Sequence, residues 1–121
     1  MQKILVVDDH PDIRQLVRIL LDRHYEVLEA ETGEEAIDIA RRHIPAAAIL
    51  DIMMPGALNG FQVLSAIKND TALRSIYVVM VTACGQASDY DQATALGADA
   101  YFVKPFSPLS LVSHIREQVA N

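Results

Sequence analysis

Short runs of consecutive apolar residues recur along the chain, and each has the length of a β-strand. Four of these runs occupy residues 4–7, 46–50, 77–81 and 100–103. An unbroken apolar run is typical of a strand buried on both faces of a parallel sheet. A fifth segment, residues 25–30, is interrupted by Glu26 and Glu29, which favours a strand at the sheet edge. The pattern therefore predicts five strands, four of them buried on both faces.

Segments with the apolar period of a helix follow these strands. Between residues 11 and 21 apolar residues recur at the spacing i, i+3, i+4, i+7 and i+8, and Pro11 stands where a first-turn proline is tolerated. Residues 33–43, 60–69 and 111–119 repeat the pattern. Residues 86–96 follow it most weakly, because they are rich in alanine and carry few large apolar side chains. Strands and helices are thus expected to alternate along the whole chain.

This alternation predicts an α/β protein with right-handed crossovers and helices on both faces of a parallel sheet. We expect a flavodoxin-like (βα)5 three-layer sandwich, with a five-stranded parallel sheet in the order 2-1-3-4-5. A crevice is expected at the carboxyl ends of strands one and three. The chain has no repeat, linker or low-complexity segment, so residues 1–121 are predicted to form a single domain. Fold alone does not determine the function.

Composition excludes several classes of protein. No apolar run approaches the roughly 20 residues of a membrane span, and the N-terminus does not resemble a signal peptide. The net charge of −6, without a basic patch, argues against nucleic-acid binding. The single cysteine, Cys84, cannot form an intrachain disulfide. Together these features favour a cytoplasmic protein.

Polar residues mark the carboxyl ends of the predicted strands, where they are expected to converge. Strand one leads into Asp8 and Asp9, strand three into Asp51, strand four into Thr82 and strand five into Lys104. Three neighbouring carboxylates would raise one another's pKa values unless a cation compensates them. A hard divalent cation, Mg²⁺ or Mn²⁺, suits these oxygen ligands. Beside such a metal, the arrangement suggests phosphoryl transfer to Asp51, with Lys104 and Thr82 contacting phosphoryl oxygens.

The sequence blocks ILVVDDHPD, AAAILDIMMPGALNGF, VVMVTA and GADAYFVKPFSP together resemble the receiver domain of bacterial response regulators, in the superfamily of chemotaxis regulators. The resemblance covers nearly the whole chain. It implies that Asp51 accepts a phosphoryl group from a histidine kinase or histidine phosphotransfer protein. It further implies that Mg²⁺ is held by Asp8, Asp9, Asp51 and the backbone carbonyl of Met53.

The resemblance also implies a switch. Lys104 would contact the phosphoryl group, Thr82 would move towards it, and Tyr101 would change rotamer. An output protein or domain would read this change on the fourth helix, fifth strand and fifth helix, about residues 86–119. The domain would be a monomer or a phosphorylation-linked dimer that binds neither membranes nor nucleic acid directly. It would act as a switch that assists its own phosphorylation and dephosphorylation rather than as an enzyme.

Two departures from the family pattern affect these expectations. The loop between Pro55 and Gly60 has one residue more than the family usually has, although it follows the metal-binding carbonyl. Met53 and Cys84 occupy positions that flank the phosphoryl pocket, and neither side chain orients an attacking water well. Slow self-dephosphorylation is therefore expected.

Simpler structural interpretations stand beside these assignments. Asp8 or Asp9 could cap the following helix, Thr82 and Tyr101 could be ordinary packing residues, and Lys104 could be a surface residue. The Lys104–Pro105 step is a candidate cis peptide that would aim the ammonium inward. The four histidines (His10, His24, His43 and His114) have no second ligand at a useful spacing and are interpreted as structural or surface residues.

Three other functions fit less well. A haloacid-dehalogenase-type phosphatase would have an Asp-x-Asp after strand one, whereas the Asp8–Asp9 doublet has no spacer. A flavodoxin-like cofactor binder would have a Ser/Thr-rich phosphate loop there. A degenerate receiver, acting only as a scaffold, would have lost Asp51 or the acidic pair. The phosphorylation switch is thus the preferred interpretation.

Overall fold

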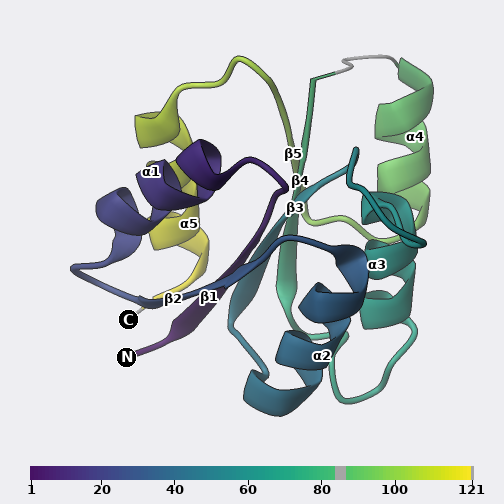
Figure 1. Cartoon of the computed structure of the whole chain (residues 1–121), viewed down its shortest axis with the longest axis horizontal. Helices are drawn as coiled ribbons and strands as arrows, with labels where there is room; N and C mark the ends of the chain where they lie inside the picture. The colour runs from purple at the N-terminus through teal and green to yellow at the C-terminus, as the bar shows by residue number, and fades with distance from the viewer. Residues whose placement is uncertain (84–86, 121) are drawn as a thin grey trace.

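The computed structural model describes residues 1–83 and 87–120, and in these residues strands and helices alternate (Figure 1). All strand pairs are parallel and lie in the order β2-β1-β3-β4-β5, which confirms the predicted flavodoxin-like α/β fold. The elements, in chain order, are β1 (Lys3–Val7), α1 (Pro11–Leu21), β2 (Glu26–Ala30), α2 (Gly33–His43), β3 (Ala47–Asp51), α3 (Gly60–Lys68), β4 (Tyr77–Thr82), α4 (Ala87–Ala95), β5 (Ala100–Val103) and α5 (Pro108–Gln118).

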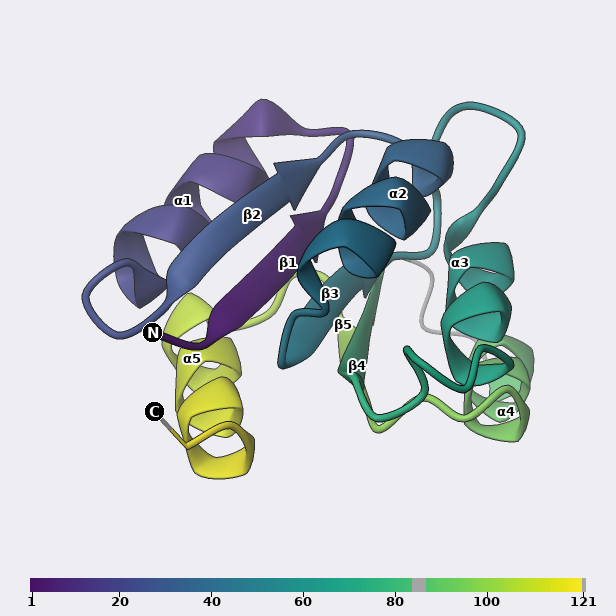
Figure 2. The ribbon, with the colours of Figure 1, turned by 90° about the horizontal axis from the view of Figure 1, so that it is seen from below.

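Helices cover both faces of the sheet. Helices α1 and α5 lie on one face, and α2, α3 and α4 lie on the other (Figures 1 and 2). Successive side chains of a strand point to opposite faces, so each inner strand contributes to both cores. In β1, for example, Leu5 and Val7 pack with α2 and α3, whereas Ile4 and Val6 pack with α1 and α5. This explains the unbroken apolar runs of β1, β3 and β4.

Strand β5 differs from its prediction. Residues 100–103 were predicted to be buried on both faces, and this is wrong. Ala100, Tyr101 and Phe102 are half-buried, and Val103 is 42% exposed. The strand order places β5 at the edge opposite β2, where it pairs with β4. An apolar run reports hydrophobicity, whereas burial also depends on where the strand lies in the sheet.

Two helix starts are fixed beside the carboxyl ends of the strands. The Thr32 hydroxyl accepts a hydrogen bond from the Glu35 N–H at the start of α2 (3.2 Å). At the start of α3, Asn59 and Gln62 form a reciprocal capping box. Among the described residues, no helix is long and apolar enough to cross a bilayer.

Candidate functional site

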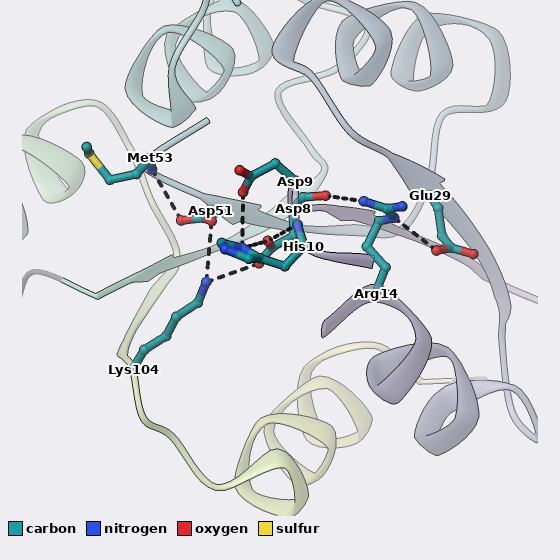
Figure 3. Close-up of polar contacts among 8 residues, drawn as sticks. All are labelled: Asp8, Asp9, His10, Arg14, Glu29, Asp51, Met53 and Lys104. Carbon is teal, nitrogen blue, oxygen red and sulfur yellow. Dashed lines mark hydrogen bonds and ion pairs between the residues drawn. The ribbon is translucent and has the colours of Figure 1, made fainter. Parts of the chain in front are cut away.

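The acidic residues after β1 and at the end of β3 lie side by side at the carboxyl edge of the sheet (Figure 3). The pairing of Val7 with Leu50 brings the next residues, Asp8 and Asp51, together. Both are buried, with 3% and 4% of their surface exposed. Burial by itself disfavours the charge of both carboxylates, so their partners decide how each one titrates.

Lys104 bridges these two carboxylates. Its ammonium nitrogen Nζ lies 3.1 Å from Oδ2 of Asp8 and 3.3 Å from Oδ2 of Asp51. The Lys104 N–H also donates to the carbonyl of Thr82 (2.6 Å), and the Lys104–Pro105 peptide bond is cis. A residue that follows an edge strand thus reaches the middle of the sheet.

The two buried carboxyl groups have pKa values shifted in opposite directions. Burial and the neighbouring Asp8 charge raise the pKa of Asp51 above 3.8, although Lys104 and the Met53 N–H work against this. Burial also raises the pKa of Asp8, but hydrogen bonds from His10 and Lys104 outweigh it and the pKa lies below 3.8. Burial lowers the pKa of Lys104, and the two carboxylates reverse this, so its pKa lies above 10.5. The site therefore contains a cationic lysine and a destabilised Asp51 carboxylate.

Four side chains here could hold a metal ion together: Asp8, Asp9, His10 and Asp51. One candidate ligand atom from each lies within 4.8 Å of all the others. Lys104 contacts two of the three carboxylates, and burial, followed by the charge of Asp8, still raises the pKa of Asp51 despite this lysine. Oxygen donors with excess negative charge are what Mg²⁺ binds. The residues present therefore fit a divalent cation.

His10 corrects the sequence-based interpretation that no histidine has a second ligand nearby. Its ring nitrogen Nδ1 lies 2.9 Å from Oδ1 of Asp8 and 3.1 Å from Oδ1 of Asp9. The chain turns sharply from β1 into α1, and the His10 N–H also donates to Asp8 Oδ1 (2.9 Å). This turn folds the ring back over the carboxylates, a contact that sequence spacing does not reveal. The hydrogen bond between the ring and Asp8, together with the charges of Asp9 and Asp8, raises the pKa of His10 above 6.5.

The capping alternative for the acidic pair is not what the structure shows. The N-cap residue of α1 is His10, and no side chain caps that helix end. His114 has a structural environment, because its Nε2 lies 2.7 Å from the Tyr77 hydroxyl. In residues 1–83 and 87–120, no other group of three or more acidic, histidine or cysteine side chains could hold a metal.

Arg14 is a site residue that the sequence analysis missed. Its Nη1 donates to the backbone carbonyl of Asp8 (2.7 Å), and its Nε donates to Glu29 of β2 (3.2 Å) (Figure 3). The side chain is almost fully buried. The sequence does contain an indication of this burial. Arg14 shares the helical spacing of Val17 and Leu21 and so lies on the buried face of α1.

The other predicted residues surround this cluster. The Met53 N–H donates to Oδ1 of Asp51 (3.2 Å), and its side chain is exposed. Thr82 ends β4 and is fully buried, one residue beyond Val81, which pairs with Asp51. Tyr101 lies half-buried in β5, with its ring edge-to-face against Tyr90 at 5.4 Å between centroids. The expectation for Cys84 falls outside the described residues.

Helix α3 begins against the backbone of Asp51 and Ile52. The Gly60 N–H donates to the carbonyl of Ile52 (2.9 Å). A Cβ at Gly60 would lie 2.7 Å from the Ile52 Cα and still closer to the Asp51 carbonyl oxygen. Only glycine allows this approach. Gly60 therefore sets how closely the start of α3 packs against the backbone of Asp51.

A parallel α/β sandwich with an acidic crevice and a half-buried lysine at its strand ends is the arrangement expected of a signalling receiver. A sequence model described as "Response regulator receiver domain" matches residues 4–116, and the chain belongs to this family. It is thus the receiver domain of a response regulator, a signalling switch of two-component systems.

Similar proteins support this assignment. The response regulator GtcR of Aneurinibacillus migulanus is 40% identical over 117 residues, which are 96% of this chain and 47% of GtcR. The phosphate regulon transcriptional regulatory protein PhoB of Escherichia coli is 37% identical over 95% of this chain and 50% of PhoB. The chain thus spans about half the length of these relatives. The structure of the chemotaxis protein CheY4 of Vibrio cholerae superposes with a TM-score of 0.89 at 32% identity, covering 98% of this chain and 99% of CheY4.

Proposed function

We propose that Asp51 accepts a phosphoryl group from a phosphohistidine of a histidine kinase or phosphotransfer protein. The observation that carries this proposal is the environment of Asp51, which is buried, destabilised as a carboxylate and yet contacted by Lys104. In the transfer an Asp51 oxygen forms the new P–O bond, and the P–N bond to the donor imidazole breaks. The departing imidazole nitrogen keeps the bonding electron pair.

The neighbours of Asp51 orient it for this reaction. Met53 donates to Oδ1 and Lys104 contacts Oδ2, so both carboxylate oxygens have fixed directions. A fixed nucleophile has less orientational entropy to lose in the transition state. After transfer, the Lys104 ammonium stays within reach of the new phosphoryl oxygens and stabilises their charge.

Asp8, Asp9, Asp51 and the backbone carbonyl of Met53 would hold the ion, Mg²⁺ or in its place Mn²⁺. When bound, such an ion neutralises charge on the transferring phosphoryl group. The role of this chain's residues is to present their carboxylates already assembled. Arg14 contributes because it holds the backbone of Asp8 in place.

Phosphorylation would bias a two-state equilibrium. Thr82 would move towards the phosphoryl oxygens, and Tyr101 would change rotamer in response. The readout surface would be α4, β5 and α5, which an output protein or output domain would contact. By the family pattern, Met53 and Cys84 would leave self-dephosphorylation slow. In this proposal residues 1–121 act as a single receiver unit, as a monomer or as a phosphorylation-linked dimer.

The test is intact-mass measurement after incubation with acetyl phosphate and Mg²⁺. A single phosphoryl adduct is expected in the wild type. It should be absent when Mg²⁺ is chelated and absent in Asp51→Asn. The matched control is Asp38→Asn, an exposed carboxylate on α2 that pairs with Arg42, and it should be phosphorylated like the wild type. An adduct that persists in Asp51→Asn would refute the assignment of the acceptor.

A further inference from the structure

We propose that His10 is a ligand of the metal site and makes it prefer late first-row transition ions, such as Ni²⁺ and Zn²⁺, over Mg²⁺. This inference rests on the metal site of the proposed function and names the class of ion that the site selects. It depends on the position of one ring nitrogen, Nδ1 of His10, relative to the carboxylates that follow β1.

The positions of three donor atoms carry the first step. His10 Nδ1 lies 2.9 Å from Oδ1 of Asp8 and 3.1 Å from Oδ1 of Asp9. Ligand bonds of about 2.1 Å that meet at right angles place neighbouring donor atoms about 3.0 Å apart. His10 Nδ1 therefore lies at the spacing of an adjacent ligand from each of these two carboxylate oxygens. Asp51 belongs to the same group, in which one candidate ligand atom of each residue lies within 4.8 Å of the others.

The chemistry of the donors gives the second step. Imidazole nitrogen suits Zn²⁺, Ni²⁺ and Cu²⁺, whereas Mg²⁺ is bound by oxygen. The three carboxylates serve either class of ion. His10 adds binding free energy only for the ions that accept nitrogen. The ratio of affinities, more than the affinity for any single ion, should therefore depend on His10.

The surroundings of His10 allow the site to bind an ion either with or without the imidazole ring as a ligand. Its side chain is 62% exposed, so the ring can leave the carboxylates without opening a cavity in the core. Asp8, in contrast, is buried and its backbone is held by Arg14. A rigid oxygen site with one adjustable nitrogen ligand can hold hydrated Mg²⁺ with the ring displaced, or a transition ion with the ring bound. The two ions would then compete for the carboxylates beside Asp51.

The test is calorimetric titration of the tag-free domain with Ni²⁺, Zn²⁺ and Mg²⁺ separately, for the wild type, His10→Gln and His43→Gln. The His43 variant is the matched control, because His43 is an exposed histidine at the end of α2 outside the cluster. Loss of an outer-sphere partner already weakens metal binding by about 10–100-fold. We therefore expect His10→Gln to weaken Ni²⁺ and Zn²⁺ binding at least tenfold and to change Mg²⁺ binding far less.

A spectroscopic measurement separates coordination from hydrogen bonding. With one equivalent of Cu²⁺, electron paramagnetic resonance of the wild type and of His43→Gln should show nitrogen hyperfine splitting that His10→Gln lacks. Equal weakening of Ni²⁺ and Mg²⁺ in His10→Gln would overturn the proposal, because His10 would then only orient the carboxylates. Unchanged Ni²⁺ binding would also overturn it. If the wild type binds Mg²⁺ and is phosphorylated but fails these tests, only this inference is wrong; failure to bind any divalent ion would refute the metal site itself.

Discussion

Asp51 and Asp8 are neighbouring buried carboxylates with opposite energetic roles. The pKa of Asp51 is raised, first by burial and then by the charge of Asp8. The pKa of Asp8 is lowered, because the hydrogen bonds from His10 and Lys104 outweigh its burial. In the metal-free protein at neutral pH, the ionised Asp51 therefore destabilises the fold, whereas the ionised Asp8 stabilises it. Of these two carboxylates, Asp51, the proposed phosphoryl acceptor, is therefore the one whose ionised form the fold destabilises.

Asp51→Asn should raise the melting temperature of the metal-free domain by a few degrees. About 1 kcal/mol corresponds to about 4 °C for a domain of this size. A raised folded-state pKa means that the stability from protonated Asp51 is present below 3.8 and lost as the pH rises through the folded pKa. The advantage of the variant should therefore disappear as the pH falls towards 3.8. Thermal melts with chelator across this pH range measure it, and a lower melting temperature for Asp51→Asn at pH 7 contradicts it.

Asp8→Asn should have the opposite effect at neutral pH. The lowered pKa of Asp8 gives stability that is present above 3.8 and lost as the pH falls through the folded pKa. Replacement by Asn removes this contribution, so the metal-free variant should melt below the wild type at pH 7. The same melts, run in parallel with Asp51→Asn, provide the comparison. Stabilisation by both substitutions would show that the two carboxylates simply repel each other.

Arg14→Met should weaken Mg²⁺ binding although Arg14 is not a proposed ligand. The substitution removes the donor to the Asp8 carbonyl and the partner of Glu29, at a cost of about 1–3 kcal/mol in the free energy of unfolding. Calorimetric titration with Mg²⁺ and urea unfolding measure the two effects. Arg41→Met is the control, because Arg41 is exposed and lies 4.0 Å from Asp70, remote from the site. Unchanged Mg²⁺ affinity in Arg14→Met would rule out this positioning role.

At the scale of elements, the contact between α3 and β3 determines where Asp51 stands. Gly60 begins α3 and lies against the backbone of Asp51 and Ile52. The capping box of Asn59 and Gln62 defines the same helix start from the solvent side. The loop at residues 55–59, which is predicted to carry one residue more than the family pattern, thus ends at a fixed point.

Gly60→Ala should therefore destabilise the domain by about 1–3 kcal/mol and also reduce the rate of phosphorylation by acetyl phosphate. The added methyl group must push α3 away from the strand or distort the end of β3. Gly97→Ala is the comparison, because Gly97 has a φ of +99° and a Cβ there would meet only the flexible Lys68 side chain. That variant should lose about 1 kcal/mol through backbone strain and keep its phosphorylation rate. Equal rates for both variants would refute the link between α3 and Asp51.

At the scale of the whole molecule, the two ends of the chain meet beside β2 and α5. Gln2 donates to the carbonyl of Ala120 (3.1 Å). The buried Tyr25 hydroxyl donates to the carbonyl of Val119 (2.6 Å), which is the C-cap of α5. Burial raises the pKa of Tyr25 above 10.0. This hydrogen bond joins the start of the edge strand to the last helix across most of the sequence.

Tyr25→Phe should destabilise the domain by about 1–2 kcal/mol, because the buried Val119 carbonyl loses its donor. The raised pKa means that the contribution of the neutral phenol is present below pH 10.0 and lost as the pH rises through the folded pKa. The difference between wild type and variant should therefore shrink in alkaline solution. Urea unfolding between pH 7 and pH 11 measures this, with the exposed Tyr90→Phe as control. A difference that stays constant with pH contradicts the assignment.

Much of this architecture is readable from the sequence because its signals are local. The strand β1 and helices α2 and α3 follow apolar periods that adjacent residues define, and the convergence of Asp8, Asp51 and Lys104 follows from the strand order. Three features depended on information that periodicity lacks. The exposure of β5 follows from its place at the sheet edge, the fold-back of His10 from the turn before α1, and the Arg14–Glu29 contact from the packing of α1 on β2.

The central claim, that Asp51 is the phosphoryl acceptor, is tested most directly by locating the modified residue. Borohydride reduces an acyl phosphate, so the phosphorylated aspartate becomes homoserine, which tandem mass spectrometry of peptides can identify. After treatment with acetyl phosphate and Mg²⁺, we expect homoserine at position 51 and unmodified aspartate at positions 8 and 9. Homoserine at position 8 or 9, or a phosphorylated histidine with Asp51 unchanged, would contradict the account.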